Sequence, residues 1–116
     1  MKYVLYNPLA SNKTGEKIAK QFVVTEGLDK TPGDLVYRNI TTLDLRFQLE
    51  SLYPGDDVYI VGGGGTILRF AQEIRGMEIK NNLYFSPSGA GNDFFNDIAK
   101  PGEKYTRVND YIKHVH

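Results

Sequence analysis

Apolar residues along the chain follow two patterns, which predict two kinds of element. Short continuous runs, rich in β-branched and aromatic residues, predict buried strands over Lys2–Tyr6, 35–37, 58–61 and 83–85. The segments between them repeat apolar residues at the spacing of an amphipathic helix. The helix faces expected to be buried are Ile18, Ala19 and Phe22; Leu45, Leu49 and Leu52; Ile67, Phe70, Ala71 and Ile74; and Phe94, Phe95 and Ile98. This alternation predicts an α/β fold, a three-layer sandwich around a mostly parallel, Rossmann-like sheet.

Polar residues before the periodic segments predict where the helices begin. Asn12 or Thr14 is expected to cap the first helix. Thr41 and Asp44 have the spacing of a capping box before the second helix. The third helix is expected to start at Thr66, directly after a run of glycines.

The glycine run consists of Gly62, Gly63, Gly64 and Gly65 and follows the third predicted strand. Because glycine has no Cβ, we expect this loop to use positive φ angles and to let phosphates approach its backbone. A helix start at Thr66 would add unpaired N–H groups and the positive end of a dipole. The spacing matches neither the dinucleotide fingerprint nor the Walker A motif. We interpret the loop as a phosphate site, and the alternative is a tight turn that binds nothing.

Three other loops also follow predicted strands and are expected to lie beside the glycine loop. In parallel sheets, ligands bind outside the carboxyl ends of the strands, where such loops converge. The candidate ligand-binding residues in these loops are Asn7, Pro8, Thr41, Thr42, Ser88, Gly89, Gly91 and Asn92. Asp93 can orient phosphates or hold Mg²⁺ through water, but at a helix start it can equally act as a cap. The convergence favours a nucleotide more than any single motif does.

The composition narrows the classes of protein. A chain of 116 residues fits one domain. Its 14 basic and 14 acidic residues form no long runs, so charge does not favour nucleic acid or a strongly anionic membrane as partner. The absence of cysteine excludes disulfides and thiolate chemistry. The chain starts with a strand rather than a signal peptide, and no apolar run approaches the ~20 residues of a membrane span. We therefore expect a cytoplasmic protein.

Three motifs occur in the order and at the spacing of one enzyme family. They are Asn7-Pro8 after the first strand, a GGDGT-like loop at 62–66 and a GTGNDF-like loop at 89–94. On these motifs, nearly the whole chain resembles the catalytic domain of the diacylglycerol kinase family, which includes bacterial lipid kinases and sphingosine kinase relatives. The resemblance implies the nucleotide-binding fold shared by diacylglycerol kinases and NAD kinases. It also implies that ATP with Mg²⁺ lies over the glycine loop and that the γ-phosphoryl group passes to a diacylglycerol-like hydroxyl, with Asp93 as the catalytic and metal-binding candidate.

Three positions depart from the family pattern. Gly64 stands where the family has an acidic residue, Ala90 where it usually has threonine, and Ala10-Ser11 where it tends to have Ser-Gly. Nucleotide binding can survive these changes because backbone donors supply much of it, whereas a full catalytic rate is not expected. A catalytically silent nucleotide-binding or regulatory module is therefore one alternative. An NAD kinase-like enzyme is another, although the loop at 89–94 is more similar to the lipid kinases.

The resemblance also divides the chain. Residues 1–104 correspond to the nucleotide-binding domain, and residues 105–116 to the segment that leads into a second, β-rich domain. We expect this last segment, which includes His114 and His116, to be poorly ordered or paired with another copy. The chain alone is expected to bind ATP weakly without phosphorylating diacylglycerol. The sequence is also compatible with peripheral contact with the inner face of a membrane and with formation of a homo-oligomer.

Overall fold

The computed structural model describes residues 1–88 and 93–114. Within these ranges the strands are β1 (Lys2–Tyr6), β2 (Leu35–Asn39), β3 (Asp57–Gly62), β4 (Leu83–Pro87) and β5 (Thr106–Arg107). They form one sheet in the order β2-β1-β3-β4-β5, in which β5 runs antiparallel to β4 and the other neighbours are parallel. The four strands expected from the apolar runs are confirmed. β5 was not predicted, because its two residues are too short to show a pattern.

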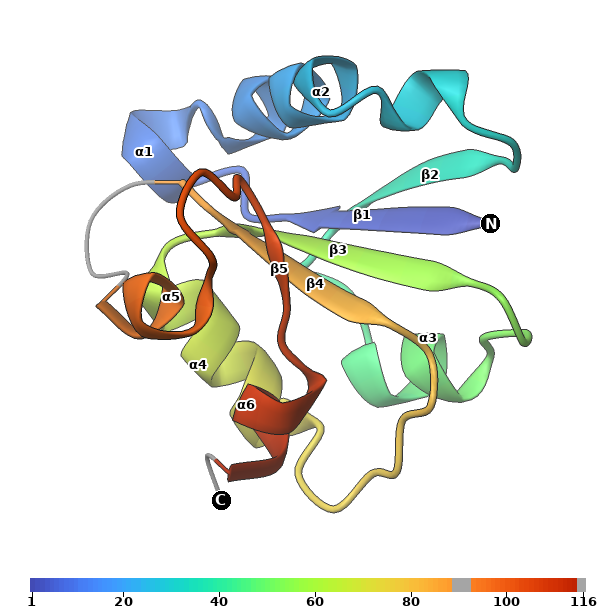
Figure 1. Ribbon diagram of the computed structural model, residues 1–116. Helices are drawn as coiled ribbons and strands as arrows, with labels where there is room; N and C mark the ends of the chain where they lie inside the picture. Colours follow the sequence, from blue (N-terminus) through green and yellow to red (C-terminus); the bar gives the residue numbers. More distant parts are fainter. Residues whose placement is uncertain (89–92, 115–116) are drawn as a thin grey trace.

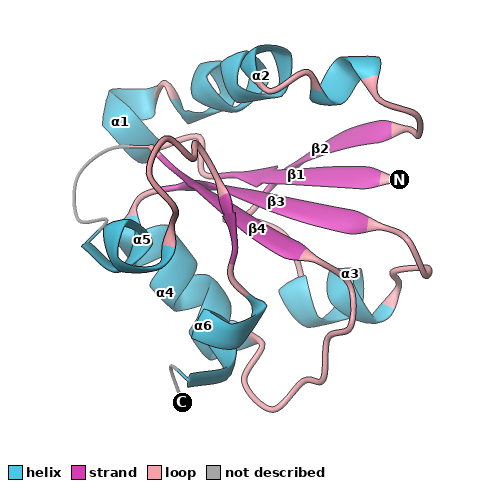
Figure 2. Ribbon diagram, in the orientation of Figure 1, coloured by secondary structure: helices cyan, strands magenta, loops and turns pink. Residues whose placement is uncertain are grey.

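Helices lie on both faces of this sheet (Figures 1 and 2). One face carries α1 (Ala10–Lys13) and α2 (Gly15–Thr25), after which comes the 3₁₀ turn η1 (Leu28–Lys30). The other face carries α3 (Leu45–Glu50), α4 (Gly64–Glu73), α5 (Asp93–Ile98) and α6 (Asn109–His114). The α/β class with a mostly parallel sheet is therefore confirmed, and the arrangement is compatible with a Rossmann-like fold.

Each face of the sheet has its own hydrophobic core. The core on the α2 side consists of Val4, Ala19, Phe22, Val23, Leu28, Tyr59 and Val61. The larger core on the other side includes Leu5, Leu45, Leu49, Ile60, Phe85, the α4 residues Ile67, Phe70 and Ala71, and Ile74 at the C-cap of α4. Neighbours such as Val4 and Leu5 lie in different cores because successive side chains of a strand point to opposite faces. The buried face predicted for α4 is confirmed, since all four of its residues are at most 2% exposed.

The predicted burial of Ile98 on α5 is wrong. Its side chain is 42% exposed, whereas Phe95 is buried. Ala99, four residues after Phe95, packs against the same core. Residues four apart share a helix face, so this pair defines the buried side of α5 and leaves Ile98 off it. The side chain of Phe94 lies outside the described part of the structure.

The start of α3 also differs from the prediction. Asp44, rather than Thr41, is the N-cap residue, and its carboxylate accepts a hydrogen bond from the N–H of Phe47 at 3.1 Å. Thr41 instead belongs to the turn that follows β2, described below with the site. At α2, Thr14 occupies the N-cap position as expected, but its side chain makes no capping hydrogen bond.

The segment expected to be poorly ordered packs onto the sheet as far as residue 114. The Tyr105 ring contacts Phe22 edge-on at 5.5 Å between centroids. Val108, directly before α6, and Ile112 on α6 are 0% and 6% exposed in the larger core. Asn109 accepts a hydrogen bond from the Leu83 N–H at 2.9 Å, which joins α6 to β4. These apolar and polar contacts explain why the expectation was wrong.

A buried carboxylate holds the amino end of the sheet together. Asp56 is 6% exposed and accepts hydrogen bonds from the N–H of Tyr53 at 2.8 Å and from the amino group of Met1 at 3.0 Å. The hydrogen bond from Tyr53, aided by the Met1 amine, holds the pKa of this carboxyl below its ordinary value, although burial opposes the shift. The ionised form of Asp56 is thus favoured by the fold.

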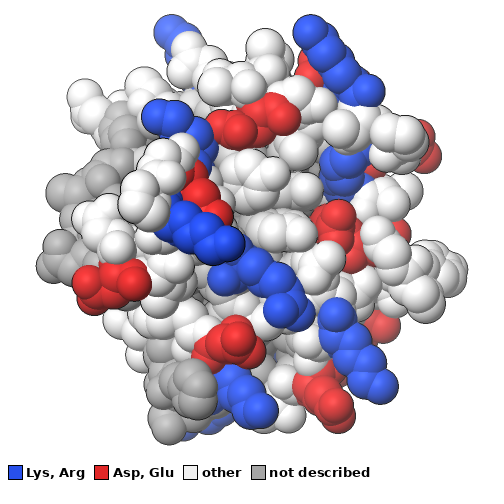
Figure 3. Space-filling view, in the orientation of Figure 1, with Lys and Arg blue, Asp and Glu red and all other residues white. Residues whose placement is uncertain are grey.

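The surface has no strong charge bias on the face shown in Figure 3, where positive and negative side chains are interspersed. This agrees with the formal net charge of zero. Among the helices of residues 1–88 and 93–114, none is long and apolar enough to cross a membrane.

Candidate functional site

The loops that follow β1 and β3 meet at the carboxyl edge of the sheet. Asn7, directly after β1, donates from its side-chain amide to the Thr66 hydroxyl at 3.5 Å, across 59 residues of sequence. The side-chain oxygen of Asn7 accepts from the N–H of Leu9 at 2.9 Å, which turns the chain sharply after the strand. Two predicted site residues are thereby brought together. Pro8 shapes the same turn but does not line the hollow described below.

The backbone around Asn7 is packed against the start of α2. A Cβ added at Gly15 would lie 1.8 Å from the carbonyl oxygen of Asn7, a distance that no side chain tolerates. Glycine is therefore required there for α2 to approach the end of β1. The chain turns at the last two residues of α1, Asn12 and Lys13, whose φ angles are 60° and 68°. Left-handed conformations cost ordinary residues about 1–2 kcal/mol each, so this turn is held in place by its surroundings.

The glycine run adopts a different backbone from the one expected. The chain has several glycines at positive φ, but Gly62, Gly63, Gly64 and Gly65 are not among them. Gly63 is the extended N-cap residue of α4, and the next two glycines form the first residues of the helix. The helix therefore starts at Gly64, two residues before Thr66. Packing of α4 against the sheet outweighs the low helix propensity of glycine.

Two of these glycines have distinct physical roles. A Cβ added at Gly62 would lie 2.8 Å from the Cβ of Thr66, so the end of β3 needs glycine to let the helix pass. A Cβ added at Gly65 would meet no atom within 4 Å, so this glycine borders open space. Gly62 is thus a packing requirement, whereas Gly65 leaves a surface accessible.

The open surface carries hydrogen-bond donors. The Gly63 carbonyl accepts from the N–H groups of Thr66 at 3.1 Å and Ile67 at 3.3 Å. The N–H groups of Gly64 and Gly65 have no acceptor in the described part of the chain, as is usual in the first turn of a helix. Together with the positive end of the α4 dipole, these donors suit an anion.

The end of β2 contributes a closed turn. The Asn39 side chain accepts from both the N–H and the hydroxyl of Thr41, at 2.9 and 2.6 Å. The N–H and hydroxyl of Thr42 approach the Asn39 carbonyl, each at 3.4 Å. Thr41 lines the hollow beside Asn7 and Thr66, whereas the predicted candidate Thr42 does not.

The end of β4 is joined to the end of β3. The N–H of Ser88 donates to the Gly62 carbonyl at 2.8 Å, and Ser88 is 8% exposed. The predicted site residues Gly89, Gly91 and Asn92 lie outside the described residues. Asp93 begins α5, but its side chain is likewise outside the description. The structure therefore places Ser88 beside the end of β3 and does not test the other candidates of this loop.

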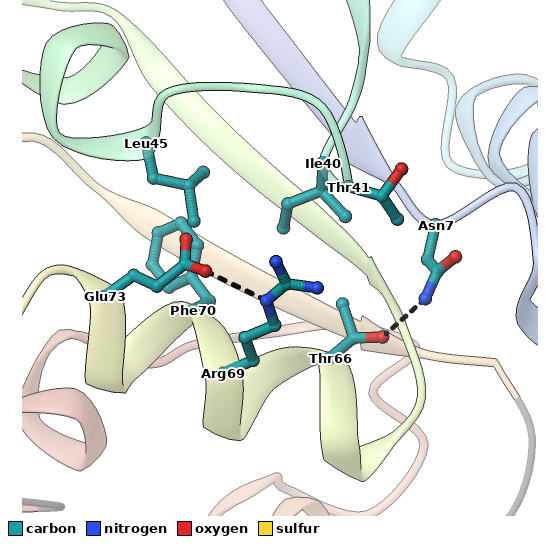
Figure 4. Close-up of a pocket in the computed structure, with 8 residues that line it drawn as sticks. All are labelled: Asn7, Ile40, Thr41, Leu45, Thr66, Arg69, Phe70 and Glu73. Atoms are coloured by element: carbon teal, nitrogen blue, oxygen red, sulfur yellow. Dashed lines mark hydrogen bonds and ion pairs between the residues drawn. The ribbon is translucent and has the colours of Figure 1, made fainter.

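A small hollow lies between α4 and the turn after β2 (Figure 4). Its lining consists of Asn7, Ile40, Thr41, Leu45, Thr66, Arg69, Phe70 and Glu73. The space that a water-sized sphere can reach there is about 20 Å³, close to the room needed by one water molecule. A nucleotide does not fit inside it, so a ligand of that size would lie over the edge.

Arg69 is the cation at this hollow, and the sequence patterns did not single it out as a site residue. Its Nε donates to Glu73 Oε1 at 2.9 Å, which forms an ion pair between residues four apart on α4. However, Figure 4 places the guanidinium beside Thr66, one turn earlier on α4. The three-residue spacing between Thr66 and Arg69 was the available signal, because such residues are neighbours on a helix.

Comparisons with known proteins do not decide the family. The chain matches no family model, no curated protein and no solved structure. The resemblance to the diacylglycerol kinases therefore rests on the three motifs alone, and the function derived from it is a proposal.

Proposed function

We propose that the chain binds the phosphates of ATP at the carboxyl edge of its sheet, over the turn at 62–66. The observation that carries this proposal is the pair of N–H groups on Gly64 and Gly65, which open α4 without an acceptor in the described residues. An anion there would gain both hydrogen bonds and the favourable end of the helix dipole. The amide of Asn7 and the hydroxyl of Thr66 lie beside these donors and add polar contacts.

We further propose that the chain is the nucleotide-binding part of a lipid kinase, which transfers the γ-phosphoryl group of ATP to a diacylglycerol-like hydroxyl. Support comes from the motifs at Asn7-Pro8 and 62–66, which lie together at one edge although they are far apart in sequence. Phosphoryl transfer depends mainly on positioning and on neutralising the charge of the phosphates. Fixed backbone donors can supply part of both.

Mg²⁺ is implied by this function, and its usual protein ligands are one or two carboxylates together with the substrate phosphates. The described side chains at the edge offer amides, hydroxyls and the Arg69–Glu73 pair instead. In residues 1–88 and 93–114 there is no group of three His, Cys, Asp or Glu residues that could hold a metal. These described side chains do not fit a protein-held ion, so the proposal assigns Mg²⁺ to the nucleotide phosphates. Asp93, whose side chain lies outside the described part of the structure, remains the candidate carboxylate for it.

A silent nucleotide-binding module is the second candidate, and Gly64 favours it. This glycine stands where the resembling family has a carboxylate, and it lies in the first turn of α4 beside the open N–H groups. Without that carboxylate, ATP can bind while transfer to an acceptor is slow or absent. The two candidates therefore differ in turnover and agree on binding.

Titration calorimetry with ATP tests the binding of ATP, which both candidate functions require. Gly65→Val adds a side chain whose Cβ meets no atom within 4 Å in the free protein. If phosphates lie against this turn, affinity should fall more than about ten-fold, or roughly 1.4 kcal/mol. Gln72→Val adds the same side chain at an exposed position near the other end of α4 and serves as control. Unchanged affinity in a folded Gly65→Val protein would remove the turn from the site.

Radiolabelled phosphate transfer then separates the candidates. Diacylglycerol in mixed micelles and NAD are offered as acceptors to the same preparation. Transfer to the lipid supports the lipid kinase, and transfer to NAD supports the NAD kinase-like alternative. ATP binding without transfer to either supports the silent module.

A further inference from the structure

Arg69 is held in an orientation that leaves part of its guanidinium group available. Its Nε donates to Glu73 Oε1 at 2.9 Å. In Figure 4 the two terminal nitrogens point away from that carboxylate, toward the space between Ile40 and Thr66. No hydrogen bond from these nitrogens is found among residues 1–88 and 93–114.

The ion pair with Glu73 contributes too little to stability to explain why Arg69 adopts this orientation. Both side chains are on the surface, with 64% of Arg69 and 38% of Glu73 exposed. Pairs of this kind at i and i+4 contribute little to folding. The geometry is informative in another way, because it separates the charges along α4. The carboxylate lies toward the end of the helix, and the guanidinium lies toward the donors at its start (Figure 4).

We infer that Arg69 binds a phosphate group of the ligand directly, together with the Asn7 amide and the Thr66 hydroxyl. A guanidinium presents a planar fork of N–H donors that matches two oxygens of a phosphate, and such charge-assisted pairs are stronger than neutral hydrogen bonds. Glu73 fixes the fork through Nε and leaves the terminal nitrogens for the ligand. The ligand class is a polyphosphate anion, and the inference rests on the proposed function in that both use the same edge.

Binding of ATP and of inorganic tripolyphosphate by the full chain tests this role. Arg69→Gln should weaken the binding of both by about ten-fold or more, because it removes a charge-assisted contact. Arg69→Lys keeps the charge without the fork and should bind with intermediate affinity. Arg75→Gln, an equal loss of charge two turns further along the chain, is the control and should bind as the wild type does. Each variant should unfold within about 2 °C of the wild type, since exposed pairs contribute little.

The outcomes separate this inference from the proposed function. Equal affinity of Arg69→Gln and the wild type, or an equal loss in Arg75→Gln, overturns the role of Arg69 while ATP binding stands. A wild-type chain that binds tripolyphosphate but not ATP, with the expected loss in Arg69→Gln, supports Arg69 and overturns the nucleotide. A wild-type chain that binds neither overturns both.

Discussion

The same substitution should destabilise the protein at one glycine of the turn after β3 and not at another. Gly62→Ala places a Cβ 2.8 Å from the Cβ and Cγ2 of Thr66, and 2.9 Å from its Oγ1. Because the Thr66 Cβ is fixed to the helix backbone, rotating the side chain cannot relieve this contact. The start of α4 has to move away from β3. Gly65→Ala meets no atom within 4 Å and lies within the helix.

The expected magnitudes follow from these distances. Forcing an extra methyl group into a packed site costs about 1–3 kcal/mol. In a domain of this size, each kcal/mol lowers the unfolding midpoint by roughly 4 °C, so Gly62→Ala should lose about 4–12 °C. Alanine is favoured over glycine in a helix by up to about 1 kcal/mol, so Gly65→Ala should be as stable as the wild type or slightly more stable.

Urea unfolding followed by circular dichroism, with thermal unfolding as a second measure, gives both values. The wild type and the two variants should share one urea dependence, so that the midpoints report stability directly. Gly62→Ala should also lose ATP affinity, because Thr66 and the first turn of α4 shift together. Equal stability of the two variants, or a lower midpoint for Gly65→Ala, would refute the assignment of Gly62 as a packing requirement.

Three further variants test other parts of the structure. Gly15→Ala should destabilise more than Gly62→Ala, because its Cβ would lie 1.8 Å from the carbonyl oxygen of Asn7, and urea unfolding of both compares them directly. Gly64→Asp should add about 0.3–1 kcal/mol of stability through the helix dipole. If the chain is a lipid kinase, the new carboxylate should also raise phosphate transfer by about 10²–10⁴-fold. Unchanged transfer with intact ATP binding would favour the silent module. Asp56→Asn should destabilise the chain most above the ordinary carboxyl pKa of 3.8, because the lowered pKa in the fold makes the ionised form stabilising. As the pH falls further, through the lowered pKa, this difference from the wild type should shrink in urea unfolding followed over pH, and a difference that stays constant would contradict the assigned charge state.

Apolar spacing predicted the parts of the fold in which burial determines the conformation. β1 and the buried face of α4 agree with the sequence patterns because both depend on local periodicity. The start of α4 was predicted two residues late, since glycines read as a loop until tertiary packing holds them in a helix. Thr41 was predicted to cap α3, but its N–H and hydroxyl donate to the side chain of Asn39 instead. These hydrogen bonds depend on a turn that the residue types alone do not specify.

The sequence predicted which loops form the site, but not the backbone conformation of the turn before α2 or the position of the cation at the site. Topology places the loops after β1, β2, β3 and β4 at one edge, so the convergence of Asn7, Thr41 and Thr66 follows from a parallel sheet. The left-handed backbone at Asn12 and Lys13 was not foreseen, because positive φ was expected in the glycine run. Arg69 was not among the predicted site residues. Its place beside Thr66 depends on how α4 crosses the sheet, which a helical pattern leaves undetermined.

The strand order determines when the site can form during synthesis of the chain. β1 lies between β2 and β3, and Asn7 is joined to a residue 59 positions later. A ribosome that has produced only the first half of the chain has made one side of the site without its partner. Long-range pairing of this kind slows folding relative to helical bundles, because loops must close before their contacts form. Ligand-binding competence should therefore emerge late and abruptly, once β3 and α4 have left the exit tunnel.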